Sequence, residues 1–167
     1  KFESLTFFIP HNFSRDLGKI NWVSKKNIHL TLKFLNEVDE NLVSEIIKKL
    51  NEVKFEDFEI ELDKLSVFPN ENYANVLWVG IKEVNKVIEL HQDIEEKLNN
   101  SFKNDKEFGC HITLGRVKLL KKKKEFIDII RNTEIKNLKT KVSFFSLIKS
   151  ELNKDSPKYS LITKFNF

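Results

Sequence analysis

Several features that define common classes of protein are missing from this chain. A single cysteine, Cys110, excludes an intramolecular disulfide, and with no second cysteine and no closely spaced histidine pair a structural zinc site lacks ligands. No apolar run approaches the roughly eighteen residues of a membrane-spanning helix. There is no methionine, so one or more residues upstream of Lys1 are expected to be missing. The absences favour a domain of the reducing cytoplasm with no signal peptide and no membrane partner.

The charge of the chain gives only a weak indication of its partner. Twenty-nine basic residues outnumber 25 acidic ones, for a net charge of +4. A mixture of this kind mostly forms a solvated surface, and the small excess mildly favours an anionic partner. The balance therefore becomes useful only beside a motif that handles anions.

Two tetrapeptides provide such a motif: His29-Leu30-Thr31-Leu32 and His111-Ile112-Thr113-Leu114. On a strand, successive side chains point to opposite faces, so each histidine shares a face with its threonine while the aliphatic residues face a core. One such pattern usually has no functional meaning. Two of the four histidines begin the same pattern about half a chain apart, which predicts a site built by two similar halves, each contributing one motif.

The hydrophobic pattern predicts a single α+β domain over 1–167. The predicted strands are 2–9, 27–34, 58–68, 76–81, 108–117, 142–147 and 159–167, and the predicted helices are 12–18, 39–53, 83–99 and 121–132, with a turn at 69–72. The repeated order of these elements favours two similar lobes, related by a pseudo-two-fold axis, with mostly antiparallel sheets and outer helices. We expect His91 at the edge of its helix, His11 on the surface, and Cys110 as a buried small hydrophobe, not a nucleophile.

If the two lobes face each other, two imidazoles flank an active-site cleft. One neutral imidazole can take a proton from water while the other, protonated, gives one to a leaving oxygen. Thr31 and Thr113 can donate hydrogen bonds to phosphate oxygens. Gly115 allows a bulge or a local twist that lets Arg116 reach the groove, where its planar fork suits a phosphate. The alternative is that Arg116 is a surface residue at the end of the strand. Lys118 and the run 121–124 either form a rim that attracts RNA or a solvated face. Such a site needs no metal, no cofactor and no covalent nucleophile.

Both motifs and their flanks resemble the two-histidine (2H) phosphoesterases, in particular the LigT/ThpR-type RNA 2′,3′-cyclic phosphodiesterases, also called 2′-5′ RNA ligases. The similar flanks are Trp22-Val23, Leu32-Lys33-Phe34-Leu35, Val76-Leu77-Trp78-Val79-Gly80, Phe108 and Gly115-Arg116-Val117. The resemblance extends from the first strand to the final Tyr159-Ser160-Leu161-Ile162. It departs from the family in a short segment between Pro10 and Trp22, in Cys110 in place of a proline, and at Asn36 and Asn75.

The resemblance implies a bilobal fold with a central cleft and metal-independent hydrolysis of 2′,3′-cyclic phosphate RNA ends to 2′-phosphomonoesters. It also implies a reversible 2′-5′ joining of tRNA halves, and we expect a monomer. His29 and His111 match the acid-base pair, Thr31 and Thr113 the phosphate-holding residues, and Arg116 the arginine after the second motif. Analogy with similar sites favours His111 as base and His29 as acid. Phe34, at the equivalent offset in the first motif, is a weaker candidate for contact with a base, and we expect it in the core instead.

Two other functions are compatible with the same residues. A non-catalytic module would bind nucleotides without turnover, although a binder has no need of two titratable groups. Alternatively, the enzyme would act on small cyclic phosphates such as 2′,3′-cyclic mononucleotides, which present the same ring to the same cleft. Turnover of cyclic RNA ends, in competition with mononucleotides, separates the three.

Overall fold

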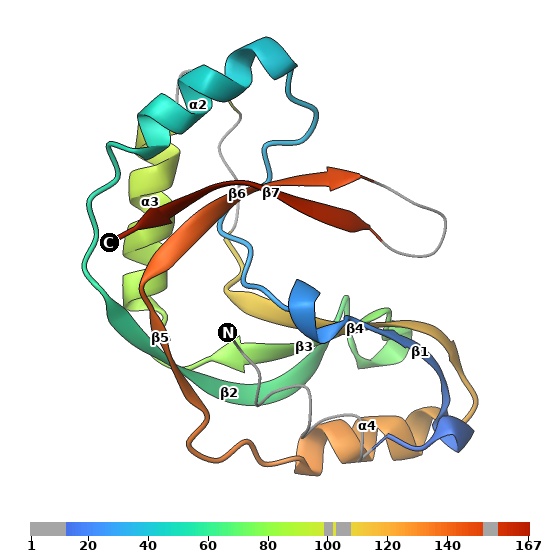
Figure 1. Ribbon diagram of the computed structural model, residues 1–167. Helices are drawn as coiled ribbons and strands as arrows, with labels where there is room; N and C mark the ends of the chain where they lie inside the picture. The colour runs from blue at the N-terminus through green and yellow to red at the C-terminus, as the bar shows by residue number, and fades with distance from the viewer. Residues whose placement is uncertain (1–12, 99–101, 103–107, 152–156) are drawn as a thin grey trace. The chain divides into compact units, whose positions relative to one another are not determined.

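The computed structural model describes residues 13–98, 102, 108–151 and 157–167, which form an α+β fold with antiparallel sheets (Figure 1). In chain order the elements are β1 (Gly18–Trp22), α2 (Val43–Leu50), β2 (Phe58–Phe68), β3 (Val76–Ile81), α3 (Asn85–Leu98), β4 (His111–Leu120), α4 (Lys123–Asn132), β5 (Lys139–Val142), β6 (Phe144–Glu151) and β7 (Lys158–Asn166). Short 3-10 helices occupy Arg15–Leu17, Lys25–Asn27, Glu40–Leu42 and Glu71–Tyr73. No helix in these ranges is long and apolar enough to cross a membrane.

The first of two compact units, which we call the first unit, comprises Lys1–Thr31, Ile60–Val84 and Gly109–Thr140. Its main feature is a sheet in the order β1-β4-β3-β2-β5, so β4 lies between β1 and β3. The pairs of β4 with both neighbours are antiparallel. Helix α4 lies beside this sheet in Figure 1, with Phe126 completely buried. The core of this unit thus covers the face of β4 that carries the buried residues Ile112 and Leu114.

The second unit comprises Leu32–Glu59, Asn85–Phe108 and Lys141–Phe167. Its two helices, α2 and α3, pack with the antiparallel pair of β6 and β7 around one hydrophobic cluster. The buried members are Ile46, Leu50, Leu90, Ile94, Leu98, Phe145 and Phe165. Helical spacing of the apolar residues on α3 puts them on the face that this cluster covers.

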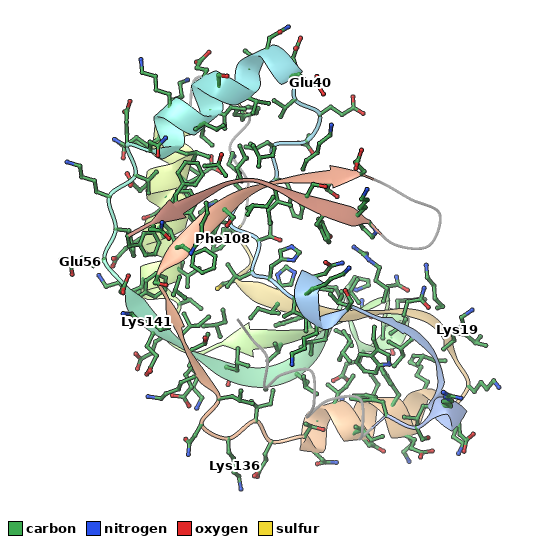
Figure 2. The ribbon with its side chains drawn as sticks, in the orientation of Figure 1. Lys19, Glu40, Glu56, Phe108, Lys136 and Lys141 are labelled. Atoms are coloured by element: carbon green, nitrogen blue, oxygen red, sulfur yellow. The ribbon has the colours of Figure 1, made fainter. Side chains whose placement is uncertain are left out.

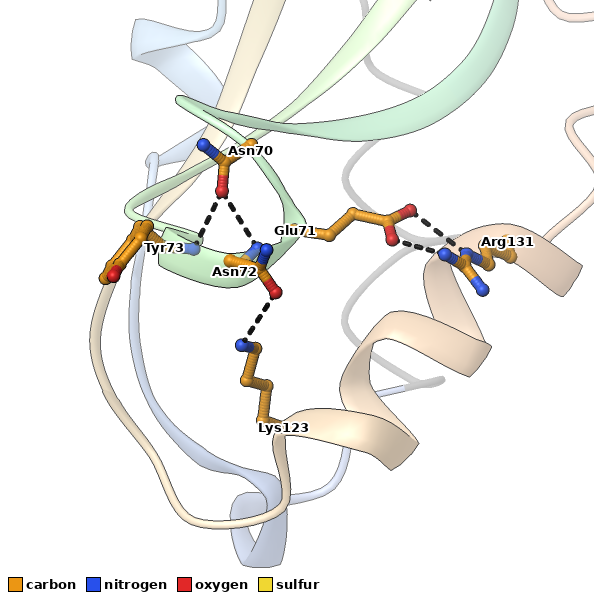
Figure 3. A network of polar contacts seen from close by, with 6 residues as sticks. All are labelled: Asn70, Glu71, Asn72, Tyr73, Lys123 and Arg131. Carbon is orange, nitrogen blue, oxygen red and sulfur yellow. Dashed lines mark hydrogen bonds and ion pairs between the residues drawn. The ribbon is translucent and has the colours of Figure 1, made fainter.

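A polar network fastens the turn after β2 to helix α4 (Figure 3). The Asn70 side chain accepts hydrogen bonds from the backbone amides of Asn72 and Tyr73, which caps the 3-10 turn. Arg131 of α4 forms an ion pair with Glu71 and lowers the pKa of that carboxyl group, mainly through the hydrogen bond it donates. The hairpin of β2 and β3 is therefore braced from α4 within the first unit.

The structure confirms the predicted α+β class with antiparallel sheets, and the predicted bounds of β2 and β3 are those observed. The expected strand at 27–34 is wrong. Lys25–Asn27 forms a 3-10 helix, and the segment after it pairs with the sheet only at Leu30. Strand β1 was not predicted, because five residues with only two apolar side chains, Ile20 and Trp22, give little periodic signal. The predicted strand at 2–9 and His11 lie outside the described residues.

Assignment of one motif to each lobe is also wrong. The boundary between the units falls after Thr31 and before Gly109, so His29, Thr31, His111 and Thr113 all belong to the first unit. The reason is the pairing of Leu30 with Ile112, which attaches the first motif to the same sheet as the second.

The predicted bulge at Gly115 is present in β4. Leu77 of β3 pairs with Gly115, but the next residue, Trp78, pairs with Thr113, so Leu114 is the extra residue. A Cβ atom at Gly115 would lie 2.9 Å from Cγ2 of Ile20 and 3.3 Å from Cε3 of Trp22. Only glycine leaves room for β1 to approach β4 at this point.

We predict that Gly115→Ala lowers the free energy of unfolding by about 1–3 kcal/mol, the usual cost of overpacking. Thermal or urea unfolding measures this change. Gly80→Ala is the matched control in neighbouring β3, because the nearest atom to its Cβ would be an ordinary 3.5 Å away. Equal stability losses in the two variants would contradict the steric explanation.

Candidate active site

The second motif lies at the start of β4, with the alternation that the sequence predicts. Ile112 and Leu114 are buried in the core, whereas His111 and Thr113 are half-buried on the other face. The histidine and the threonine therefore share one face of the sheet, which we call the site face.

The aromatic side chains of Phe68 and Trp78 surround His111 on the site face. Trp78 pairs with Thr113 in the sheet, and its ring centroid lies 5.8 Å from that of His111. The ring of Phe68 stacks on that of Trp78, with centroids 4.8 Å apart, and meets the imidazole of His111 edge-on, with centroids 5.0 Å apart. These neighbours were missed from the sequence. The alternation of β3 assigns Trp78 to a face, but only the register between strands reveals which residues it meets.

The bulge also determines where Arg116 lies. Arg116 is the third residue after Thr113, so on a regular strand the two would point to opposite faces. The extra residue at Leu114 restores the alignment: Thr113 pairs with Trp78 and Arg116 with Val76, which are two residues apart on β3. Arg116 is exposed, and no carboxylate among the described residues forms an ion pair with it. It is therefore available to an anion on the site face.

The first motif lies along the other edge of β4. Its backbone leaves the 3-10 helix in an extended conformation at Ile28, and Leu30 pairs with Ile112 in antiparallel fashion. In an antiparallel pair the residues on either side are opposed in reverse order. This register sets His29 opposite Thr113 and Thr31 opposite His111. Each histidine thus has the threonine of the other motif as its neighbour.

Both imidazoles are oriented by the same local contact. Nδ1 of His29 lies 2.7 Å from the carbonyl oxygen of Asn27, and Nδ1 of His111 lies 2.7 Å from that of Gly109. A carbonyl oxygen can only accept a hydrogen bond, so in each ring Nδ1 carries a hydrogen and donates the hydrogen bond. In a neutral ring the lone pair is therefore on Nε2, which can take up a proton, and in a protonated ring Nε2–H can donate one. Either histidine can act as acid or as base.

The remaining predicted residues are placed as follows. Phe34 is 69% exposed and lies in the second unit, so its expected core position is wrong. His91 is buried on α3, not at the helix edge. Lys118 and the run 121–124 are exposed at the far end of β4 and the start of α4. Within the described ranges no group of three or more histidine, cysteine or acidic side chains could hold a metal ion.

Cys110 precedes His111 and is half-buried instead of fully buried as expected. Burial raises the pKa of its thiol from 9.0 to about 11. The thiolate is the nucleophilic form, so this environment makes the side chain a poor nucleophile at neutral pH.

Comparisons with known proteins show which family and which fold this chain is similar to. A family model described as LigT-like phosphoesterase matches residues 12–78. The RNA 2′,3′-cyclic phosphodiesterase of Methanocaldococcus jannaschii is 33% identical over 96% of this chain and 98% of its own length. The one from Archaeoglobus fulgidus is 36% identical over 86% and 81%, respectively. The crystal structure of E. coli LigT in apo form covers 99% of this chain and 89% of its own, with a TM-score of 0.77 at 21% identity, and shares the fold.

We predict that Cys110 is alkylated slowly in the folded protein. With a thiol pKa of about 11 instead of 9.0, the folded protein has about 100-fold less thiolate near pH 8 than the unfolded protein has. The rate of alkylation should rise as the pH approaches 11. Because the folded state keeps the thiol proton to a higher pH than the unfolded state does, the free energy of unfolding should fall between about pH 9 and 11. Iodoacetamide labelling followed by mass spectrometry measures the rate, with urea-unfolded protein as the control. Labelling of folded protein at the unfolded rate would refute the burial effect.

Proposed function

The chain belongs to the LigT-like phosphoesterase family, and we propose that it hydrolyses 2′,3′-cyclic phosphate ends of RNA to 2′-phosphomonoesters. Relatives named RNA 2′,3′-cyclic phosphodiesterase, 33% and 36% identical over most of the chain, support the reaction class. The single observation that carries the mechanism is the matched orientation of His29 and His111, each held through Nδ1 by a carbonyl two residues upstream.

In the proposed mechanism one neutral histidine takes a proton from water through Nε2, and the water oxygen forms a bond to phosphorus. The bond from phosphorus to the 3′ oxygen breaks, and the other histidine, protonated, donates its Nε2 proton to that oxygen. The phosphate remains on the 2′ oxygen. We assign His111 as base and His29 as acid, by analogy with similar sites. After turnover the two rings have exchanged protonation states, and proton exchange with water restores them.

The threonines and Arg116 bind the phosphate in this proposal. The hydroxyl groups of Thr31 and Thr113 donate hydrogen bonds to the non-bridging oxygens, which fixes the phosphorus between the two imidazoles. Arg116 adds a charge-assisted contact, because the bulge turns it to the site face. Hydrogen-bond donors of the chain itself thus stabilise the negative charge of the phosphate.

Ligation requires no further site. A 2′-5′ linkage forms when the 5′ hydroxyl of a second RNA replaces water and the roles of the two histidines are kept. We propose this reversible joining, with tRNA halves as the natural substrates and a monomeric enzyme, as the second reaction of the same residues.

We predict that the enzyme converts a short RNA with a 2′,3′-cyclic phosphate end to the 2′-phosphate in the presence of EDTA. His29→Ala and His111→Ala should each reduce the rate at least about 100-fold, the usual contribution of general acid-base catalysis. His11→Ala, outside both motifs, is the matched control, and circular dichroism tests folding. The product is identified by the position of its phosphate.

Three outcomes would overturn parts of this proposal. Tight nucleotide binding by a wild type that leaves cyclic ends intact would indicate a binding module. Preference for 2′,3′-cyclic mononucleotides over RNA in direct competition would indicate a small-molecule substrate. Full activity after loss of either histidine would refute the paired mechanism.

We also predict a bell-shaped dependence of kcat/KM on pH. At low pH the base is protonated and cannot accept a proton, whereas at high pH the acid has lost the proton it must give. The two limbs belong to the coupled pair and not to single residues. Initial rates between pH 5 and 9 measure the profile, and each histidine variant should lose one limb with most of its rate. A flat profile in this range would contradict the mechanism.

A further inference from the structure

His91 is a buried histidine that the mechanism does not use. It lies on α3 in the row of buried residues Val87, Leu90, His91, Ile94 and Leu98, and its exposed fraction is 6%. A polar ring among apolar side chains is costly unless its nitrogens and its faces find partners. Its partners are therefore informative.

The first partner is the segment that leaves the first motif. Nδ1 of His91 lies 2.8 Å from the carbonyl oxygen of Leu32, the residue that directly follows Thr31. Because the carbonyl can only accept, His91 donates this hydrogen bond. The side chain of Leu32 packs against the core of the second unit. Both the backbone and the side chain of Leu32 are therefore held.

The second partner is the segment that enters the second motif. The imidazole of His91 stacks on the ring of Phe108, with centroids 4.1 Å apart and an angle of 8° between the planes. Phe108, labelled in Figure 2, directly precedes Gly109. The carbonyl oxygen of Gly109 is the group that orients His111. One ring thus contacts the residues that flank both motifs.

A second residue on the same face of α3 strengthens the first contact. Glu95 lies four residues after His91, so the two side chains are neighbours on the helix surface. Glu95 forms an ion pair with Lys33, and only 3% of the Lys33 side chain and 13% of the Glu95 side chain are exposed. Leu32, the last residue of the first motif, and Lys33, which follows it, are therefore bound by two consecutive turns of α3.

We infer that His91 is a positioning residue that fixes the exit of the first motif through Leu32 and the entry of the second through Phe108. The inference rests on the proposed function, because its consequence is the alignment of His29 and His111 for proton transfer. A displacement of about 1 Å in such a pair can cost about 100-fold in rate. His91 itself touches neither substrate nor reacting atoms.

Three substitutions separate the two contacts of His91. His91→Phe keeps a ring that can stack on Phe108 but has no donor for Leu32. His91→Asn places an amide N–H near the position of Nδ1 but removes the ring. His91→Ala removes both contacts. Ile94→Ala is the matched control, because it creates a cavity on the same helix face, in the cluster against which Leu32 packs, but removes neither the hydrogen bond to Leu32 nor the stack on Phe108.

We expect kcat to fall about ten-fold or more in His91→Ala, with smaller losses in His91→Phe and His91→Asn and little change in KM. Ile94→Ala should lower the melting temperature at least as much while kcat stays within about two-fold of wild type, at a temperature where all variants are folded. A loss of kcat in Ile94→Ala equal to that in His91→Ala would reduce His91 to a core residue and overturn the inference.

A second measurement does not depend on turnover. The ring ¹⁵N resonances of His29 and His111 should move in His91→Ala and stay in place in Ile94→Ala, because only the first removes the hydrogen bond to Leu32 and the stack on Phe108. Unchanged resonances together with unchanged kcat would refute the positioning role. If wild type shows no turnover but the resonances move as expected, the proposed function fails while the positioning role stands.

Discussion

The pairing of Leu30 with Ile112 is the contact on which the rest of the site depends. It is a single pair of residues, yet it attaches a segment with no regular secondary structure to the inner part of a five-stranded sheet. Because side chains alternate along an extended chain, the pair fixes which residues of both motifs face the same side. A slip by one residue would turn His29 and Thr31 away from His111 and Thr113. Half-buried Leu30 opposes such a slip, since its apolar side chain would then turn from Ile112 towards the site face.

Much of the site could be predicted from the sequence, and the part that could not depends on contacts between distant segments. Alternation along His111-Ile112-Thr113-Leu114 correctly assigned the two faces, and Gly115 correctly indicated the bulge. The strand at 27–34 was wrong because the same alternation at Leu30 reflects one pair and not a continuous ladder. The contacts of Phe68 and Trp78 with His111 could not be predicted, because the sequence of a single strand does not show how it is paired with its neighbour.

Acid and base are not distinguished by the local anchors. Nδ1 of His29 and Nδ1 of His111 have carbonyl partners at the same sequence offset and at the same distance of 2.7 Å. Any difference between the two rings must therefore come from their wider surroundings. The rings of Phe68 and Trp78 both lie against the imidazole of His111. The wider surroundings of the two rings, and not the motifs themselves, are therefore the physical basis on which the two roles can differ.

The choice of a histidine at position 91 has a physical consequence that an apolar residue would lack. An aliphatic side chain would fill the same space on α3 without the cost of burying a polar ring. Hydrophobic contact, however, is non-directional and tolerates small shifts of the chain it covers. A hydrogen bond to the carbonyl of Leu32 and a parallel stack on Phe108 each have a narrow geometric optimum. Together they favour one position for the residues beside each motif, which is the requirement of proton transfer between two fixed rings.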